Sequence, residues 1–245
     1  MPALEKAKNY DQLFHIYDHI MRNVNYSHWA SYIIQISKKF VKNPVQVLEI
    51  GSGNCKLANQ LQRHFNFFIA SDYSFRMLQS AGNRTKHKVC LDMTSLPFLN
   101  KFDLIISAFD SINYLTSVKK LSLLFREVRS VLSEKGIFTF DVSLESNSYK
   151  YLKDGNRIYK IKNIKVQQSS SFNPSTRVHT NKFIIDFKAN GSYIEVHKQK
   201  IFSFDTYFEI FQKSKLKVLD CLNAFTFEEG NKNSDRIQFV ITKTG

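Results

Sequence analysis

The sequence predicts an α/β protein with a doubly wound, mostly parallel sheet of seven strands, preceded by helices and interrupted by an antiparallel β insert. Up to residue 142, short apolar runs alternate with stretches of helical periodicity, as a parallel sheet requires. After residue 142, apolar residues alternate with polar ones, which is typical of antiparallel strands. A chain of 245 residues can bury one sizeable core, so we expect residues 1–245 to form a single domain.

The N-terminal part of the chain has helical periodicity twice. Apolar residues recur at helical spacing between 13 and 21 and again between 29 and 40. Asn43-Pro44 should end the second helix, because the residue before a proline disfavours the helical conformation. We therefore expect residues 1–43 to form a helical cap.

The next hundred residues predict the parallel part of the sheet. Five strands are indicated by apolar runs at 45–50, 67–71, 89–91, 102–107 and 137–142. Helices are expected between them at 57–65, 75–81 and 118–132. Gly136 should end the last of these helices.

An antiparallel β insert is expected over residues 150–202. Two β-rich runs, 183–187 and 193–196, flank Asn190-Gly191, a pair that is typical of tight hairpin turns. Residues 157–168 predict one further strand. Ser203 is suited to cap a helix over 204–211, and the sixth and seventh strands should follow at 216–224 and 237–242.

The ends of the first two predicted strands suggest a nucleoside site. Gly51 and Gly53 allow the backbone to turn tightly beneath a ligand, and Asp72 could accept hydrogen bonds from ribose hydroxyls. Lys56 stands where a dinucleotide fingerprint has its last glycine, and the Glu49 carboxylate would repel a pyrophosphate. That carboxylate would instead attract the ammonium and sulfonium of S-adenosylmethionine. The pattern therefore favours S-adenosylmethionine over a nicotinamide as cofactor.

Motifs along nearly the whole chain resemble those of class I S-adenosylmethionine-dependent methyltransferases. They are, in order, Glu49-Ile-Gly51-Ser-Gly53, Ser71-Asp72-Tyr-Ser, Leu91-Asp92-Met93, Phe102-Asp103-Leu-Ile-Ile and Gly136-Ile-Phe-Thr-Phe-Asp141. Within that class, residues 16–21 and 109–115 resemble small-molecule enzymes, including sugar amine N-methyltransferases. Cys55 is a departure, because a third glycine is common there. The resemblance implies a Rossmann-like methyltransferase fold.

The resemblance also implies a cofactor role for the first two strand ends. Glu49 would reach the methionine amine through water, and Gly51 and Gly53 would pass beneath the ligand. Asp72 would accept both ribose hydroxyls. Capping of helix N-termini is the alternative role for these acids.

Four more residues are candidates for the cofactor site. By the same resemblance, Asp92 and Met93 would lie against the adenine, and Ser107 would contact the methionine part. Tyr17 could close the site from the N-terminal side, although aromatic residues at helical spacing are also typical of a core.

Tyr114 and His197 are the candidate catalytic residues. Tyr114 follows the fourth strand together with Asp110 and Asn113, where ligands meet a doubly wound sheet. His197 lies in a polar row that includes the residues at 195 and 199 on one strand face. That row either faces solvent or lies over the methyl acceptor. A tyrosine or histidine beside an acceptor could take its proton.

The charge of the chain leaves alternative functions open. The formal net charge is +14, and residues 150–217 hold fourteen Lys and Arg against five Asp and Glu. We expect methyl transfer to a small-molecule acceptor, with N-methylation favoured over O-methylation. The alternatives are an RNA methyltransferase that uses the basic insert and a catalytically silent nucleotide-binding module. Specific nucleic-acid binding is not expected, because Ala108-Phe109-Asp110-Ser111 replaces the Asn/Asp-Pro-Pro-aromatic motif that grips a base amine.

Cysteine usage and hydropathy bear on the compartment. The three cysteines are scattered, and no apolar run approaches the roughly 20 residues of a membrane span. The first residues lack the apolar core of a signal peptide, so we expect a reduced, cytoplasmic protein without a membrane partner. The histidines and cysteines show no metal-ligand spacing, so no metal is expected.

Overall fold

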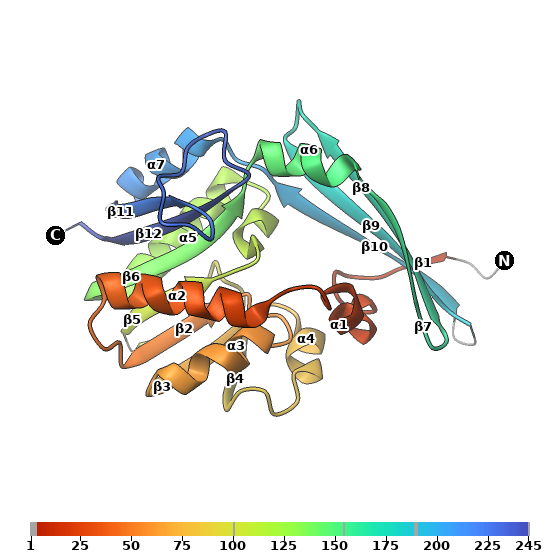
Figure 1. The fold of residues 1–245 in the computed structure, drawn as a ribbon, viewed down its shortest axis with the longest axis horizontal. Coiled ribbons are helices and arrows are strands. Elements are labelled where there is room, and N and C mark those ends of the chain that lie inside the picture. The colour runs from red at the N-terminus through yellow and green to blue at the C-terminus, as the bar shows by residue number, and fades with distance from the viewer. Residues whose placement is uncertain (1–3, 100, 154, 189–190, 245) are drawn as a thin grey trace.

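The computed structural model describes residues 4–99, 101–153, 155–188 and 191–244. It contains a seven-stranded sheet of order β11-β12-β6-β5-β2-β3-β4 and a five-stranded sheet of order β1-β10-β9-β8-β7 (Figure 1). The strands of the seven-stranded sheet are β2 (Gln46–Ile50), β3 (Phe67–Asp72), β4 (His87–Cys90), β5 (Phe102–Ser107), β6 (Leu132–Ser143), β11 (Leu216–Asn223) and β12 (Arg236–Lys243).

The seven-stranded sheet is mixed. Strands β4, β3, β2, β5 and β6 run parallel, whereas β12 pairs antiparallel with β6 and β11 pairs antiparallel with β12. Five of the six residues of the central strand β5 are buried, because both faces of the sheet are covered. The predicted doubly wound, mostly parallel fold of seven strands is confirmed.

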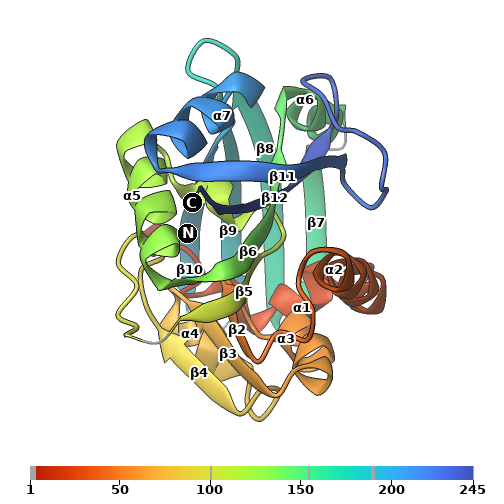
Figure 2. The same ribbon diagram turned by 90° about the vertical axis from the view of Figure 1, so that its left-hand side faces the viewer.

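Helices cover both faces of this sheet (Figure 2). They are α2 (Tyr26–Phe40) and α3 (Lys56–Leu61) on one face and α5 (Val118–Val131) and α7 (Phe204–Lys213) on the other, with α4 (Phe75–Ser80) beside β3 and β4. Ile33 of α2 packs in one core cluster with Val47, and Phe125 of α5 packs in another with Phe140. Ser203 caps α7 through its side chain, as predicted.

Several boundaries in this part differ from the prediction. Helix α5 ends at Val131, and Gly136 lies inside β6, where a Cβ atom would stand 2.8 Å from the carbonyl oxygen of Phe102. Gly136 therefore permits close strand approach and does not end the helix. The predicted third strand is shifted to His87–Cys90. The predicted helix at 13–21 is split into η1 (Leu13–His15) and α1 (Tyr17–Ile20).

The five-stranded sheet combines one N-terminal strand with four strands that follow β6 and α6 (Glu145–Lys153), a helix that the sequence did not predict. Its strands are β1 (Leu4–Lys6), β7 (Asn156–Ile161), β8 (Ile164–Asn173), β9 (Val178–Phe187) and β10 (Gly191–Lys200). The predicted single strand over 157–168 is wrong, because Lys162 adopts a left-handed φ of 47° and turns the chain between β7 and β8. The predicted β9–β10 hairpin is present, although Asn190 of its turn lies outside the described residues.

The N-terminal segment lies between the two sheets (Figure 1). Strand β1 pairs parallel with β10, and Leu13 and Ile16 pack in a core cluster with Val166 and Ile185 of the five-stranded sheet. We call residues 4–13 the strap. Within the described ranges, no helix is long and apolar enough to cross a membrane.

Candidate functional site

A cavity of about 1110 Å³ opens at the carboxyl ends of the parallel strands. This volume exceeds the roughly 300–1,000 Å³ of typical small-molecule sites, so it leaves room for two ligands. The lining residues come from the strap, from the loops after β2, β3 and β4, and from η3 (Ser111–Tyr114) after β5. Eight of the ten predicted site residues line the cavity: Tyr17, Glu49, Gly51, Gly53, Asp72, Asp92, Met93 and Tyr114.

The loop after β2 brings backbone to the cavity without bulky side chains. Gly51 and Gly53 have φ angles of +73° and +54°, which glycine adopts readily. A Cβ atom on Gly51 would stand 2.8 Å from Cβ of Ser111, so the close approach of η3 also requires glycine. Cys55 has a φ of 60° as well, which gives a physical reason why glycine is common at this position.

Glu49 lies at the base of the cavity and is 2% exposed. Burial raises the pKa of its carboxyl group to about 7. Its Oε2 atom has no hydrogen-bond partner in the part of the chain that the structure describes. An unsatisfied buried acceptor costs about 1–3 kcal/mol, and a ligand amine would remove that cost. This carboxylate therefore fits the amine end of S-adenosylmethionine.

Asp72 is fixed by the backbone on both sides. Its Oδ2 accepts a hydrogen bond from the Gly53 N–H at 2.7 Å, and its Oδ1 accepts one from the Ser74 N–H at 2.7 Å. Burial raises the pKa of Asp72, and these backbone bonds oppose that effect. Each carboxylate oxygen has capacity for a second donor, so the group can also accept from two ribose hydroxyls.

The remaining candidates for the cofactor site differ in whether they line the cavity. Asp92 lines the cavity, but its Oδ1 also accepts from the N–H and the hydroxyl of Thr94, at 2.8 and 2.7 Å. Met93 contributes an apolar wall, and Tyr17 lines the cavity with its pKa raised well above the usual range by burial. Ser107 does not line the cavity, because its side chain is buried at the end of β5.

Two tyrosines and a histidine meet on another side of the cavity, which we call the tyrosine side. The hydroxyls of Tyr10 and Tyr114 lie 2.7 Å apart, and the Tyr114 hydroxyl lies 3.1 Å from Nδ1 of His197. Burial raises the pKa of both tyrosines. His197 does not line the cavity but lies directly behind Tyr114. Tyr114 therefore stands between the imidazole and the cavity.

The polar row on β10 faces the interior. Glu195 and His197 are 0% and 2% exposed, and Gln199 donates to Oδ2 of Asp110 at 3.0 Å. The interpretation of this row as a solvated face is therefore wrong. The row points from the five-stranded sheet toward η3 and the strap.

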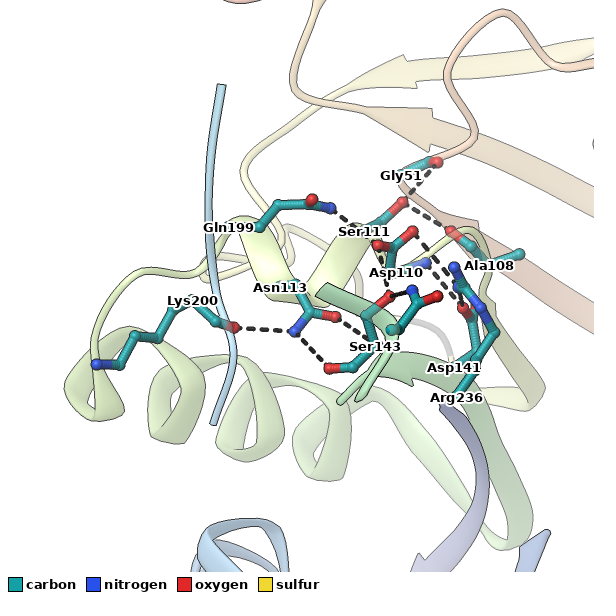
Figure 3. A network of polar contacts seen from close by, with 11 residues as sticks. Gly51, Ala108, Asp110, Ser111, Asn113, Asp141, Ser143, Gln199, Lys200 and Arg236 are labelled. Atoms are coloured by element: carbon teal, nitrogen blue, oxygen red, sulfur yellow. Dashed lines mark hydrogen bonds and ion pairs between the residues drawn. The ribbon is translucent and has the colours of Figure 1, made fainter. Parts of the chain in front are cut away.

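A buried polar network anchors η3 (Figure 3). Oδ2 of Asp110 also accepts from the Ser143 hydroxyl at 2.9 Å, and the Asp110 carboxylate forms an ion pair with Arg236 at 3.4 Å. Asn113 donates to the Lys200 carbonyl at 2.9 Å and accepts from the Ser143 N–H at 3.0 Å. Asp110 and Asn113 thus hold the loop that presents Tyr114, and neither lines the cavity.

The strap contributes lining residues that the sequence did not indicate, among them Tyr10. Strand β1 has only three residues, all exposed, and pairs with β10 through its backbone, so neither helical nor strand periodicity reveals it. Among the described residues, no group of three or more His, Cys, Asp or Glu side chains is arranged to hold a metal ion.

Comparisons with known proteins agree with this geometry. A family model described as a methyltransferase domain matches residues 47–136. A protein of Geobacillus sp. (strain WCH70) named as a methyltransferase is 24% identical over 96% of this chain and 99% of its own.

Two solved structures share the fold over almost the whole chain. An S-adenosylmethionine-dependent methyltransferase from Clostridium acetobutylicum is 24% identical, with a TM-score of 0.79 over 96% of this chain and 99% of that one. The sugar N-methyltransferase KedS8 from Streptoalloteichus sp. is 15% identical, with a TM-score of 0.76 over 100% of this chain and 96% of that one.

The family match covers the loops that hold Gly51, Asp72 and Asp92, and these loops surround the unsatisfied Glu49 carboxylate. The fold that the solved methyltransferases share with this chain extends beyond the family match and includes the five-stranded sheet. The chain is a class I S-adenosylmethionine-dependent methyltransferase.

Proposed function

We propose that this enzyme transfers the methyl group of S-adenosylmethionine to an amine of a small-molecule acceptor. The observation that carries the proposal is the pair of hydrogen-bonded hydroxyls of Tyr10 and Tyr114 on the tyrosine side of the cavity, backed by His197. Likeness to the sugar N-methyltransferase KedS8 supports an amine acceptor. The volume of the cavity, about 1110 Å³, supports an acceptor bound together with the cofactor.

In this proposal, the cofactor lies on the side of the cavity lined by Gly51, Gly53 and Asp72, which we call the glycine side. Gly51 and Gly53 pass beneath it, Asp72 binds the ribose and Glu49 binds the methionine amine. Asp92 and Met93 border the adenine, and Tyr17 closes the site. The cofactor supplies an electrophilic methyl group on a sulfonium, which an acceptor nucleophile attacks in line. The protein chiefly has to orient the nucleophile and exclude water.

The tyrosine side serves the acceptor. An amine must lose a proton before or after it attacks, and the oxygen of Tyr114 can take that proton if its own passes to Nδ1 of His197. The 3.1 Å separation of these two atoms supports such a transfer. Tyr10 adds a second hydroxyl that can orient the acceptor.

The basic stretch does not support an RNA acceptor. Of the described residues between 150 and 217, only Val196 lines the cavity. The cations along its edge come from elsewhere: Lys6, Lys8, Lys56, Arg76 and Lys120. An enzyme that bound RNA through the basic residues of the insert would also have to bring the target nucleotide of that RNA into the cavity.

Two measurements test the proposal. S-adenosylmethionine and S-adenosylhomocysteine should raise the melting temperature, because they bind the folded chain, whereas NAD should not. Each amino sugar in a panel should then be compared with the sugar that carries a hydroxyl in place of the amine, following release of S-adenosylhomocysteine. Faster methylation of the hydroxyl member of the pairs would contradict the amine preference.

A further inference from the structure

The carboxylate of Glu195 contacts both the strap and His197, the residue that in turn contacts Tyr114. Its Oε1 accepts from the N–H groups of Gln12 and Leu13, at 2.6 and 2.9 Å. Its Oε2 accepts from the Tyr10 N–H at 2.7 Å and lies 2.9 Å from Nε2 of His197. These four donors fill the acceptor capacity of a carboxylate. Three of the four belong to the strap.

The Glu195 carboxylate also decides where the proton of a neutral His197 ring lies. An ionised carboxylate only accepts hydrogen bonds, so Nε2 of His197 must carry the proton that faces it. Nδ1 is then left as an acceptor for the Tyr114 hydroxyl, 3.1 Å away. Tyr10 in turn donates to the Tyr114 oxygen over 2.7 Å. In the chain of hydrogen bonds that runs from the Tyr10 hydroxyl through Tyr114 and His197 to Glu195, each bond thereby has a defined donor and a defined acceptor.

Among the groups that contact the His197 ring, Glu195 determines which ring nitrogen carries the proton. The titratable groups that contact His197 in the described structure are Tyr10, Tyr114 and Glu195, and the ring of Phe183 covers it at 5.1 Å between centroids. Tyr114 can donate or accept, whereas Glu195 in its ionised form can only accept.

We propose that Glu195 is a positioning residue that holds His197 in the Nε2–H tautomer and does so only while the strap is docked. Docking supplies three backbone donors that hold the carboxylate in place, buried and aimed at the ring. The same docking brings Tyr10 into the cavity wall. Closure of the cavity by the strap and preparation of His197 to accept a proton are therefore one event. The inference rests on the proposed function for the role of the His197–Tyr114 pair.

Nitrogen-15 spectra of the imidazoles in the uniformly labelled protein test the tautomer without any acceptor. His197→Gln identifies the ring signals by their loss. In the wild-type protein, we expect a protonated Nε2 and an unprotonated Nδ1. Glu195→Gln should abolish this preference and, by hydrogen exchange, lower the protection of the amides of residues 10–13 at least tenfold. Asp186→Asn, which removes a carboxylate on β9 that accepts from Ser192, is the matched control and should change neither readout.

Tyr114→Phe keeps the test decisive if Glu195→Gln folds poorly. The Nε2–H tautomer should persist in this variant, because Glu195 is still present. A proton on Nδ1 in the wild-type ring, loss of the tautomer in Tyr114→Phe, or an unchanged tautomer in Glu195→Gln would each overturn the proposal. So would unchanged amide protection in a Glu195→Gln variant that has lost the tautomer. A failed acceptor screen would count against the proposed function alone, since none of these spectra depends on methyl transfer.

Discussion

The glycine side and the tyrosine side of the cavity are assembled in opposite ways. Gly51, Gly53 and Asp72 stand at the ends of two neighbouring parallel strands, and one hydrogen bond of 2.7 Å joins the two strand ends. Tyr10 and Tyr114 are 104 residues apart in the chain, and Glu195 is 185 residues from Tyr10. The first side is therefore a product of local chain geometry, whereas the second exists only when the strap, η3 and β10 are packed together.

In the proposed function, this difference separates cofactor binding from turnover. In the proposed function, a side built at adjacent strand ends can recognise the cofactor without contacts from the strap. A side built from three distant segments is complete only after closure, so it suits the step in which water must be excluded. Substitutions on the glycine side should thus change cofactor affinity, and those on the tyrosine side should change turnover.

The largest effect is expected from Asp72→Ala. Loss of two charge-assisted hydrogen bonds to the ribose should weaken S-adenosylhomocysteine by about 2–4 kcal/mol, roughly 30- to 1,000-fold. Calorimetry measures this affinity, and a thermal melt checks that the unpaired Gly53 and Ser74 amides leave the protein folded. Asp103→Ala is the control, because Asp103 also accepts from backbone N–H groups, those of Val45 and Gln46, but does not line the cavity. Equal losses from the two variants would show that the glycine side has no special role for Asp72.

The strand-end residues were predictable because the information lies within a few positions of each strand. An apolar run followed by glycines or an acid defines both the strand and the edge at which the side chain emerges. Tyr10 carries no such information, since its place depends on backbone pairing between β1 and β10. The sequence could offer His197 only as one of two alternatives, because period-two spacing names the members of a face without saying what covers it.

Gly136 illustrates the same limit inside the sheet. A glycine after a helical stretch is a common helix stop, and local reasoning placed it there. The structure uses it at a contact between β6 and the carbonyl oxygen of Phe102, which only tertiary packing creates. Features decided by a distant neighbour therefore escape prediction from a single sequence.

The next effect concerns the tyrosine side. Tyr114→Phe should lower kcat about 10²-fold, because it removes the hydroxyl that we propose passes a proton to His197. The affinity for S-adenosylhomocysteine should change by less than about 0.5 kcal/mol. Tyr26→Phe is the matched control, because it also removes a tyrosine hydroxyl from the lining of the cavity. The Tyr26 ring packs against Phe109, whereas Tyr114 contacts His197. Loss of cofactor affinity in Tyr114→Phe, with kcat retained, would remove the distinction between the two sides.

A smaller effect is expected from pH on the glycine side. The pKa of Glu49 is raised from its usual 4.5 to about 7, so the folded chain holds this proton more tightly than the unfolded chain does. The contribution of Glu49 to stability is thus greatest below pH 4.5 and is lost as pH rises through about 7. Melts of the ligand-free protein should show this loss, and Glu49→Gln should remove it.

Cofactor affinity should have the opposite trend, because in the proposed function the ionised carboxylate of Glu49 binds the ligand amine. With a pKa near 7, affinity for S-adenosylhomocysteine should rise about tenfold between pH 6 and pH 8. The affinity of Glu49→Gln should be flat over this range. A wild-type affinity that does not vary with pH would place the methionine amine away from Glu49.

The smallest effect is expected from the face that carries much of the positive charge. Lys160 and Lys165 lie directly opposite each other on β7 and β8, and Lys162 lies in the turn that joins these strands. Reversal of all three to Glu keeps the like-charge repulsion across the strand pair, so the melting temperature should stay close to that of the wild type. None of the three lines the cavity, so turnover of a small acceptor should also be nearly unchanged.

An RNA acceptor would behave differently in the same variant. Binding through these lysines would release counterions, so the logarithm of affinity would fall steeply with the logarithm of salt concentration and the reversal would flatten that slope. We expect only weak RNA binding that disappears near physiological salt, where exposed charges are screened beyond about 8 Å. Binding that survives this salt, accompanies methyl incorporation into RNA and is abolished by the reversal would make the five-stranded sheet part of the acceptor site. The tyrosine side alone would then no longer define the acceptor.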